Sequence, residues 1–362
     1  MRHRLRALPI LLLSAALTVV APGLAGADQR IRIQGTGATL PAPLYLAWAR
    51  AYLGEHPKHQ IDYQGLGSAG GLKDLDQGRV AFAGADFLLP PEAAGQVAGG
   101  IAQLPMASAG IALVYNLAGV DDLKLSRAAL VGIFDGSIAR WNDPAIAAAN
   151  PDADLPDRPI ILVVRVGASG TCYNLTRHLS RISPAFGESV GAALNPVWPE
   201  AIGKRGALVK ARGNDGVGAT VQAIDGSIGY IAYPFADFGR IPTAAIENQA
   251  GNYIQPGREG FAAAMTAIRA RDVSYDREAA KDRVSDALEV MADPPGETAY
   301  PIIAISWVSL PRSPMDPAKQ EALLDFLEYA LGPGQDIVER VGYIPFSAAG
   351  IELIKQSLAT LR

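Results

Sequence analysis

The pattern of apolar and polar positions predicts short strands and helices that follow one another along the chain. Residues 30–34 and 60–64 have strand-like patterns, and residues 43–53 carry apolar or aromatic side chains at helical spacing. A second helix is expected at about residues 72–77, and a strand at residues 80–85. This alternation is typical of an α/β fold with an open, largely parallel sheet, in which ligands bind outside the carboxyl ends of the strands.

The same alternation continues through the second half of the chain. Further strands are expected at residues 111–115, 160–165, 227–233 and 301–308. Further helices are expected near residues 127–134, 172–181, 218–223, 261–269 and 317–331. Polar stretches that contain glycine and proline, at residues 237–257 and 291–297, indicate excursions from the fold or a domain boundary.

Three short turns rich in glycine, serine or threonine each join a predicted strand to a predicted helix. They lie at residues 35–39, 65–71 and 167–171. The first turn of a helix has backbone N–H groups without intrahelical partners and carries positive partial charge. Small residues there let the backbone approach a ligand closely. The three turns together therefore predict an oxyanion-binding site.

The first 27 residues have the pattern of a secretory signal peptide. Three arginines precede the apolar run at residues 8–20, and Ala25-Gly26-Ala27 offers a small-residue cleavage site before Asp28. No stop-transfer pattern follows, so we expect removal of the segment rather than retention as a membrane anchor. The expected location of the mature protein is the periplasm.

Charge and cysteine content exclude several classes of protein. The formal charge of −4 becomes −7 when the three arginines of the leader are removed, and no block of basic residues is present. We therefore expect no nucleic-acid partner. The single cysteine, Cys172, excludes an intramolecular disulfide, so stability must come from packed cores.

Two patterns of enzymes can be compared with the sequence. The segment Gly65-Leu66-Gly67-Ser68-Ala69-Gly70 matches the dinucleotide pattern G-x-G-x-x-G, and Asp86 ends the next strand. However, this turn is not the first of its domain, and an exported protein rarely meets NAD. A metal-dependent phosphatase would need clustered His and Asp ligands, and a serine hydrolase a G-x-S-x-G turn. Neither pattern is present, so we expect no catalytic residue, metal or cofactor. His178 is expected on the surface of the helix after Thr171.

Several motifs occur in the order found in one family. They are Gly35-Thr36-Gly37-Ala38-Thr39-Leu40-Pro41, Tyr63-Gln64-Gly65-Leu66-Gly67-Ser68, residues 82–86, Arg165 with Ser169-Gly170-Thr171, Ile138-Ala139-Arg140-Trp141-Asn142-Asp143, Gly213-Asn214-Asp215-Gly216 and Ile228-Gly229-Tyr230. On these residues the chain resembles the phosphate-binding subunit of bacterial ABC phosphate transporters. The resemblance runs from Gly35 to about Tyr233, with weaker similarity to the C-terminus.

The resemblance implies a set of phosphate ligands. Thr39, Leu40, Ser68, Ser169, Gly170 and Thr171 would offer backbone N–H or hydroxyl groups, and Asp86 and Arg165 would be the two charged ligands. An arginine fork can donate two hydrogen bonds to one oxyanion. Phosphate near neutral pH still carries a proton that Asp86 can accept, whereas sulfate carries none. Asp86 would therefore select phosphate over sulfate.

The chain departs from the family pattern near the arginine. The family commonly has an acidic residue between the arginine and its Ser-Gly-Thr, and here that stretch is Val166-Gly167-Ala168. Arg165 would therefore be oriented by another acid or be freer to meet the ligand, which leaves the identity of the oxyanion open. Phe87-Leu88-Leu89 replaces the usual small residues after Asp86, so we expect a more apolar cleft wall.

The sequence thus predicts a type II periplasmic solute-binding protein with two α/β lobes and the ligand between them. Lobe I is expected to comprise residues 28–110 and 300–362, and lobe II residues 111–299. Closure of the lobes on phosphate would create the form that docks on an ABC permease. We expect a monomer. The alternatives are a different oxyanion, or an adhesive or other extracellular role outside transport.

Overall fold

A computed structural model describes residues 30–96, 99–269, 290–313 and 315–362. The predicted signal peptide at residues 1–27 lies outside the described residues. Within the described residues, none of the helices has the length and apolar character needed to cross a membrane.

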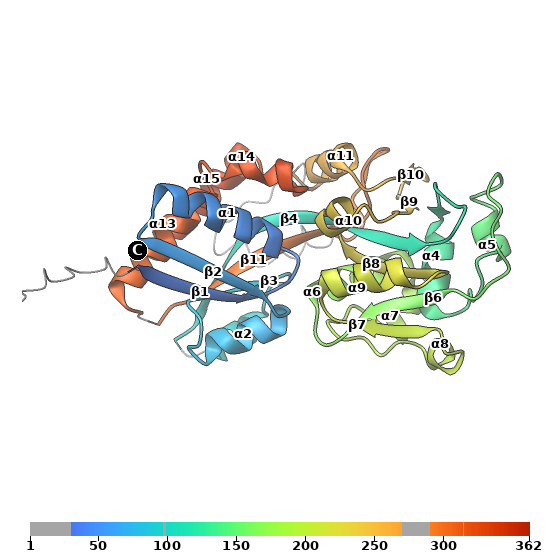
Figure 1. Cartoon of the computed structure of the whole chain (residues 1–362), viewed down its shortest axis with the longest axis horizontal. Helices are drawn as coiled ribbons and strands as arrows, with labels where there is room; N and C mark the ends of the chain where they lie inside the picture. The colour runs from blue at the N-terminus through green and yellow to red at the C-terminus, as the bar shows by residue number, and fades with distance from the viewer. Residues whose placement is uncertain (1–29, 97–98, 270–289, 314) are drawn as a thin grey trace, which may run out of the picture.

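One eight-stranded sheet extends through the whole molecule (Figure 1). Its strands, in spatial order, are β2 (His59–Gly65), β1 (Ile31–Gly37), β3 (Phe82–Ala85), β11 (Ile303–Pro311), β4 (Ile101–Asn116), β8 (Ser227–Ala232), β6 (Ile161–Arg165) and β7 (Leu208–Ala211). A small second sheet has the order β10 (Tyr253–Ile254), β9 (Ala245–Glu247) and β5 (Lys124–Leu125).

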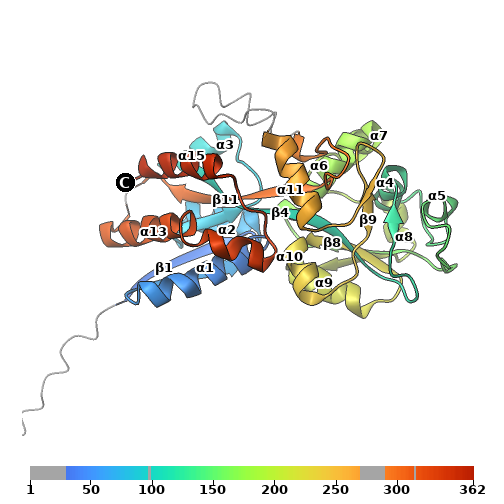
Figure 2. The same ribbon diagram turned by 90° about the horizontal axis from the view of Figure 1, so that it is seen from above.

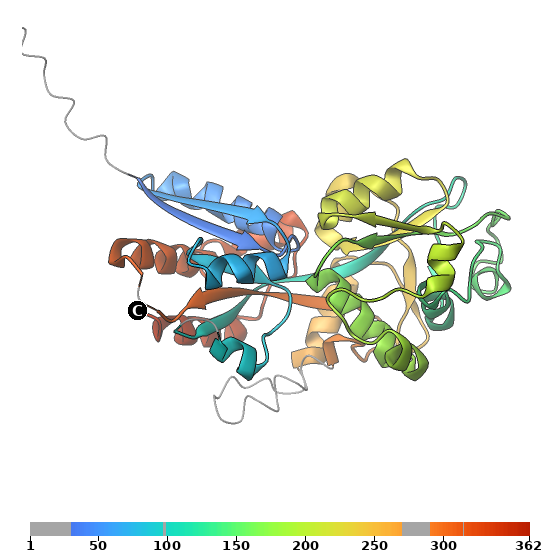
Figure 3. The ribbon, with the colours of Figure 1, turned by 90° about the horizontal axis from the view of Figure 1, so that it is seen from below.

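Strands β4 and β11 divide this sheet into two lobes. Strands β2, β1 and β3 are parallel and form the first lobe with β11, and β8, β6 and β7 are parallel and form the second. Strand β11 is antiparallel to β3 and β4, and the second half of β4 is antiparallel to β8. Figure 2 and Figure 3 show β4 and β11 passing from one lobe to the other. The parallel sheet expected from the sequence is therefore confirmed within each lobe, while its two central strands run antiparallel.

Helices cover both faces of the sheet. They are α1 (Ala42–Glu55), α2 (Ser68–Asp76), α3 (Pro91–Gln96), α4 (Arg127–Asp135), α5 (Pro144–Ala147), α6 (Gly170–Ile182), α7 (Pro184–Ser189), α8 (Glu200–Lys204), α9 (Gly213–Ala223), α10 (Tyr233–Gly239), α11 (Arg258–Arg269), α13 (Pro317–Ala330), α14 (Gln335–Val338), the 3₁₀-helix η1 (Glu339–Val341) and α15 (Ala348–Ala359). In the first lobe, α1 contacts β2 and α13, while α2 contacts β1 and β3. Consecutive parallel strands are therefore joined by helices whose first turns lie at the carboxyl edge.

Every strand and helix expected from the sequence overlaps an observed element of the same type, but some begin earlier. Helix α2 begins at Ser68, inside the turn predicted at residues 65–71, and α9 begins at Gly213, five residues before the predicted helix. Glycine has a low helix propensity, which conceals these starts. Strand β4 begins at Ile101, ten residues before the predicted strand, because small residues and Pro105 give its first half little strand character.

An aromatic cluster fills the core beneath the carboxyl edge of the first lobe. Tyr45 and Trp48 of α1 are buried together with Tyr63 of β2 and Phe82 of β3. The Tyr45 and Tyr63 rings meet edge to face, with centroids 4.8 Å apart. The Trp48 indole N–H donates to the Gly334 carbonyl at 2.8 Å. These contacts fix α1 relative to β2 and β3, and so fix the turns that precede α1 and α2.

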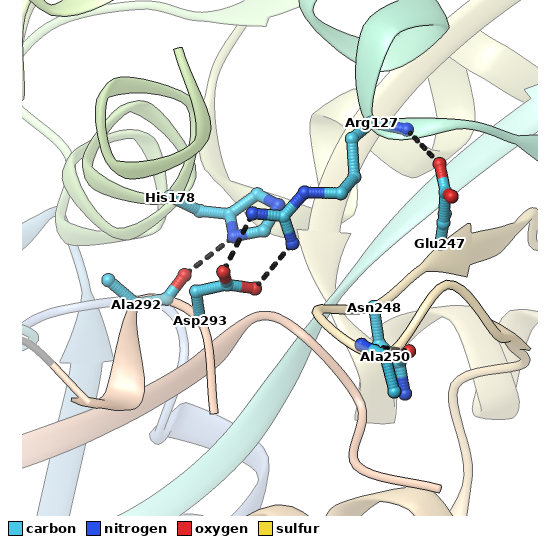
Figure 4. Close-up of polar contacts among 7 residues, drawn as sticks. All are labelled: Arg127, His178, Glu247, Asn248, Ala250, Ala292 and Asp293. Carbon is cyan, nitrogen blue, oxygen red and sulfur yellow. Dashed lines mark hydrogen bonds and ion pairs between the residues drawn. The ribbon is translucent and has the colours of Figure 1, made fainter. Parts of the chain in front are cut away.

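A buried polar cluster holds the chain that returns from the second lobe (Figure 4). His178 of α6 is fully buried, and its Nδ1–H donates to the Ala292 carbonyl at 2.5 Å. Arg127 forms two hydrogen bonds to the Asp293 carboxylate, at 3.0 and 2.8 Å. The expectation that His178 lies on the surface was wrong, because the segment that contains Ala292 covers this face of α6. Burial lowers the pKa of His178 to about 4.

Candidate functional site

The three glycine-containing turns meet at one place. The Gly67 N–H donates to the Gly37 carbonyl at 2.7 Å, which joins the turn after β2 to the turn after β1. A Cβ on Gly71 would lie only 2.3 Å from the Gly37 Cα, so this approach requires glycine. A Cβ on Gly67 would lie 3.5 Å from the Ala168 carbonyl oxygen, in the third turn and on the other lobe. The turns therefore form one site at the junction of the lobes, at the carboxyl edges of β1, β2 and β6.

Asp86 follows β3 at the centre of this junction. Its side chain is buried, with 3% of its surface exposed, and Oδ1 has no hydrogen-bond partner. Burial raises the pKa of Asp86 to about 7, although Ser306 and the positive charge of Arg165 oppose this rise. A buried carboxylate with an unpaired oxygen is costly unless a ligand completes it.

Arg165 is the last residue of β6 and approaches the junction from the second lobe. It is buried, and its Nη1 donates to the Thr171 Oγ1 at 3.3 Å. Its Nε has no hydrogen-bond partner, and none of the ion pairs among the described residues includes this side chain. Burial lowers the pKa of Arg165, and the charge of Asp86 raises it again in part. A buried, charged guanidinium without a bound carboxylate is suited to an anionic ligand.

The hydroxyl groups expected at the site are also buried there. The Ser68 Oγ accepts a hydrogen bond from the Asp86 N–H at 3.2 Å, and the Ser169 Oγ accepts one from the Cys172 N–H at 3.4 Å as the N-cap of α6. Both hydroxyl hydrogens stay available to a ligand. The Leu40 side chain is fully buried in the core, so any contact from Leu40 is through its backbone.

Asn214 is a central residue that the sequence analysis did not select. Its Nδ2 donates to the Thr39 Oγ1 at 2.8 Å on the first lobe. Its Oδ1 accepts from the Thr171 hydroxyl at 3.3 Å and from the Ala232 N–H at 3.1 Å, which fixes the orientation of the amide. Asn214 thus links hydroxyls from both lobes. Its motif, Gly213-Asn214-Asp215-Gly216, was noted, but nothing in the sequence indicated that the asparagine points inward.

Two further residues hold the lobes together beside the site. Asn174 of α6 donates from Nδ2 to the Asp86 carbonyl at 3.0 Å and to the Gly170 carbonyl at 2.8 Å. The Phe87 ring lies 6.4 Å from the ring of Tyr173, also on α6. The first turn of α6 therefore contacts the loop after β3 directly.

Cys172 is buried at the start of α6, and it is not an activated thiol. The Tyr230 hydroxyl donates to its Sγ at 3.0 Å, and burial raises the pKa of the Cys172 thiol to about 12. A place in the first turn of a helix favours a lowered pKa for a thiol, but here desolvation outweighs that effect. Among the residues that the structure describes, no group of three His, Cys, Asp or Glu side chains could hold a metal ion.

A hollow of about 660 Å³ opens beside Thr39 at the mouth of the site. Its lining includes Leu46 of α1 and Phe235 and Phe238 of α10, and Phe238 is 95% exposed. The mouth of the site thus has a partly apolar lining. The residues expected to make the cleft wall more apolar, at positions 87–89, are partly buried and do not line this hollow.

Comparison with protein families places this arrangement among known proteins. A model described as a PBP superfamily domain matches residues 22–333. The Phosphate-binding protein PstS of Xylella fastidiosa is 33% identical over 92% of this chain and 86% of its own length. That of Methanocaldococcus jannaschii is 34% identical over 84% of this chain and 79% of its own length.

Solved structures show the same fold. A phosphate binding protein from Stenotrophomonas maltophilia superimposes with a TM-score of 0.70 at 20% identity and covers 90% of this chain and 93% of its own. A high affinity periplasmic phosphate-binding protein, PfluDING, bound with phosphate superimposes with a TM-score of 0.67 at 23% identity and covers 90% of this chain and 94% of its own. The two lobes and the crossing strands are therefore those of a type II binding protein.

Proposed function

The chain belongs to the family of PstS phosphate-binding proteins, and from that premise we propose that it captures inorganic phosphate between its lobes and delivers it to an ABC permease. One observation carries the proposal. Asp86 from the first lobe and Arg165 from the second are buried together, and each has a polar atom without a partner. A ligand that fits must accept hydrogen bonds from a cation and donate one to a carboxylate.

Hydrogen phosphate meets both requirements. Its oxygens accept from Arg165, from the hydroxyls of Thr39, Ser68 and Ser169, and from backbone N–H groups of Leu40, Gly170 and Thr171. Its remaining O–H group can donate a hydrogen bond to the Asp86 carboxylate. Sulfate has no proton. When Asp86 is charged, the sulfate oxygens and the carboxylate oxygens would both be acceptors, and the buried carboxylate would be left unpaired.

Closure of the lobes is the proposed mechanism. Thr39, Ser68 and Asp86 belong to the first lobe, and Arg165 and Thr171 to the second, so a bound anion contacts both. Because a ligand shifts a conformational equilibrium only by its difference in affinity for the two states, contacts on both lobes favour the closed state. The boundaries that we propose are residues 28–110 and 300–362 for lobe I and residues 111–299 for lobe II.

The setting of this function is also a proposal. We infer that the protein works in the periplasm after removal of residues 1–27, as a monomer that binds phosphate without catalysis and has no nucleic-acid partner. The leader pattern and the absence of a basic block in the sequence support this inference.

The proposal is tested by calorimetry on purified protein that has been stripped of bound anion by unfolding and refolding. At about pH 8.5, where Asp86 is mostly charged and hydrogen phosphate still carries a proton, titration with phosphate is expected to show micromolar or tighter binding, and titration with sulfate no signal. Arsenate, which also carries a proton near neutral pH, distinguishes a general receptor for protonated oxyanions from one for phosphate. Absence of heat with all three anions would refute the proposal and favour the extracellular role outside transport.

Two variants assign the charged ligands. Asp86→Asn is expected to admit sulfate, and unchanged selectivity would remove Asp86 from its role. Arg165→Ala is expected to weaken phosphate binding by at least about 2 kcal/mol, because a charge-assisted fork is lost from a buried anion. Arg140→Ala is a matched control, since Arg140 is exposed and pairs with Asp157 away from the site.

A further inference from the structure

A buried serine on β11 lies beside Asp86, and nothing in the sequence motifs assigned it a role. Strand β11 is antiparallel to β3, with Trp307 opposite Ala85 and Val308 opposite Gly84. The pairing ends at Trp307 and Ala85, and the next residues along the two segments are Ser306 and Asp86. The two residues are therefore neighbours at the end of β3, and a hydrogen bond from the Ser306 side chain lowers the pKa of Asp86.

The hydroxyl of Ser306 is buried, and its hydrogen bonding differs from that of a neighbouring serine on the same strand. The residue is fully buried, and its Oγ makes no hydrogen bond of regular geometry, although it lies close enough to Asp86 to lower the pKa of that carboxyl. A buried hydroxyl without a regular partner is costly, and the Asp86 carboxylate is the acceptor beside it. Ser309, three residues further along the same strand, is buried to the same extent but accepts a hydrogen bond from Gln103 at 3.1 Å.

The backbone of β11 is irregular at this point. Ser306 pairs with Ala107 of β4, but the next residue, Trp307, pairs with Pro105, so the register shifts between them. Irregularities of this kind often re-aim a side chain next to a functional site. Here the shift adjoins the serine of β11 that lies beside Asp86.

We propose that Ser306 is a positioning residue for phosphate recognition. Its hydroxyl donates a hydrogen bond to one carboxylate oxygen of Asp86, and the other oxygen accepts a hydrogen bond from the O–H group of the ligand. The proposal rests on the proposed function of the site. It explains why a single carboxylate can present a directed acceptor in a cleft otherwise filled with donors. A carboxylate free to rotate would lose part of that direction.

The groups around Asp86 make its protonation measurable. Arg165 faces it from the second lobe, and Tyr45, Tyr63 and Tyr343 face it from the first. Burial raises the pKa of all three tyrosines, so none of them titrates near neutral pH. Ser306 lowers the pKa of Asp86 because its hydroxyl favours the charged carboxylate. Removal of this hydroxyl therefore keeps Asp86 protonated to a higher pH.

The test compares Ser306→Ala with Ser309→Ala and with the unaltered protein. Phosphate and sulfate are titrated by calorimetry from pH 5 to pH 9. Ser306→Ala is expected to weaken phosphate binding about tenfold, as for the loss of one hydrogen bond to a charged group. Sulfate binding, which needs a protonated Asp86 as donor, is expected to persist to a pH about one unit higher than in the unaltered protein. Ser309→Ala is expected to change neither.

The outcomes separate this inference from the function on which it rests. If the unaltered protein binds phosphate but Ser306→Ala has the same affinity and the same pH profile, the positioning role is wrong and the function stands. Equal effects of Ser306→Ala and Ser309→Ala would also overturn it, because strand packing would then be the cause. If the unaltered protein binds no phosphate, the function itself fails. Should Ser306→Ala not fold, Ser306→Cys keeps the volume with a weaker donor and is expected to shift the sulfate profile in the same direction.

Discussion

Gly170, the first residue of α6, lies directly against Asp86 across the junction of the lobes. A Cβ built on Gly170 would lie 2.3 Å from the Asp86 Cβ and 2.9 Å from its Oδ2. No real side chain tolerates such distances, so this approach exists only because residue 170 is glycine. The contact also joins the two lobes, which means that it can form only when they are closed.

Gly170→Ala is expected to prevent full closure. The added methyl group would force α6 away from the loop after β3, and the hydrogen bond from Asn174 to the Asp86 carbonyl would be lost with it. Phosphate affinity is expected to fall by at least about tenfold, since the ligand would no longer contact both lobes. Calorimetry measures the affinity, and small-angle scattering measures whether the variant stays open in the presence of phosphate.

Gly203→Ala is the control for this substitution. Gly203 lies in the helix α8, and a Cβ there meets no atom within 4 Å. This variant is expected to bind phosphate normally and to be slightly more stable, because alanine favours helix over glycine. If the Gly170→Ala variant binds phosphate normally and closes, the site tolerates a larger separation between residues 170 and 86 than the structure indicates.

Asp86→Asn is expected to change how stability depends on pH in the ligand-free protein. The folded pKa of Asp86, about 7, lies above its ordinary value of 3.8, so the folded state holds this proton more tightly than the unfolded state. Stability is therefore lost as the pH rises from about 4 to about 7, by at most about 1.4 kcal/mol for each pH unit. Asparagine does not titrate, so the stability advantage of the variant is expected to grow through this window and to level off above it.

Chemical denaturation of anion-free protein at several pH values measures this difference. Glu259→Gln, on an exposed position of α11, is the control for removal of a negative charge. A constant gap between Asp86→Asn and the unaltered protein would mean that Asp86 titrates near its ordinary pKa.

The sequence predicts most of the local features of this site, but few of the contacts between segments that are far apart in the chain. Turns rich in glycine are visible from composition, and Asp86 and Arg165 are visible at the ends of strands. The resemblance to a family then set them in one site, and the structure brings their elements together. Their roles as ligands remain predictions.

Other features depend on contacts that a single sequence does not encode. Asn214 donates to Thr39 because the first turn of α9 meets the turn after β1 on the other lobe, and the approach of Ser306 to Asp86 depends on the direction of β11. The burial of His178 follows from a segment more than a hundred residues away in the sequence. Likewise, desolvation rather than position in the helix decides the pKa of Cys172.

Asn214→Asp is expected to weaken phosphate binding strongly. The carboxylate has nearly the shape of the amide, but it removes the donor to the Thr39 Oγ1 and adds a negative charge within a buried anion site. A loss of at least about tenfold follows from either effect. Asn214→Ala removes the same donor without the charge and is expected to lose less. Titration of both variants by calorimetry separates the two causes. Equal losses of phosphate affinity in the two variants would show that the added charge has no effect.

The last prediction concerns acid stability and the cluster around His178. The folded pKa of His178, about 4, lies below its ordinary value of 6.5, because burial and the nearby charges of Arg127 and Arg177 disfavour the charged ring. The unfolded state therefore holds this proton more tightly. Stability is expected to be lost as the pH falls from about 6.5 to about 4, which is opposite in sign to the effect of Asp86.

Because the two effects oppose each other in this window, His178 is best examined in the Asp86→Asn variant. There, the free energy of unfolding is expected to fall with decreasing pH by at most about 1.4 kcal/mol for each unit. Addition of His178→Gln, which can still donate to the Ala292 carbonyl but does not titrate, is expected to flatten this slope. His56→Gln in the same background is the control, since His56 is an exposed histidine at the end of α1. A slope that persists in the Asp86→Asn, His178→Gln protein would place the responsible proton on a different group.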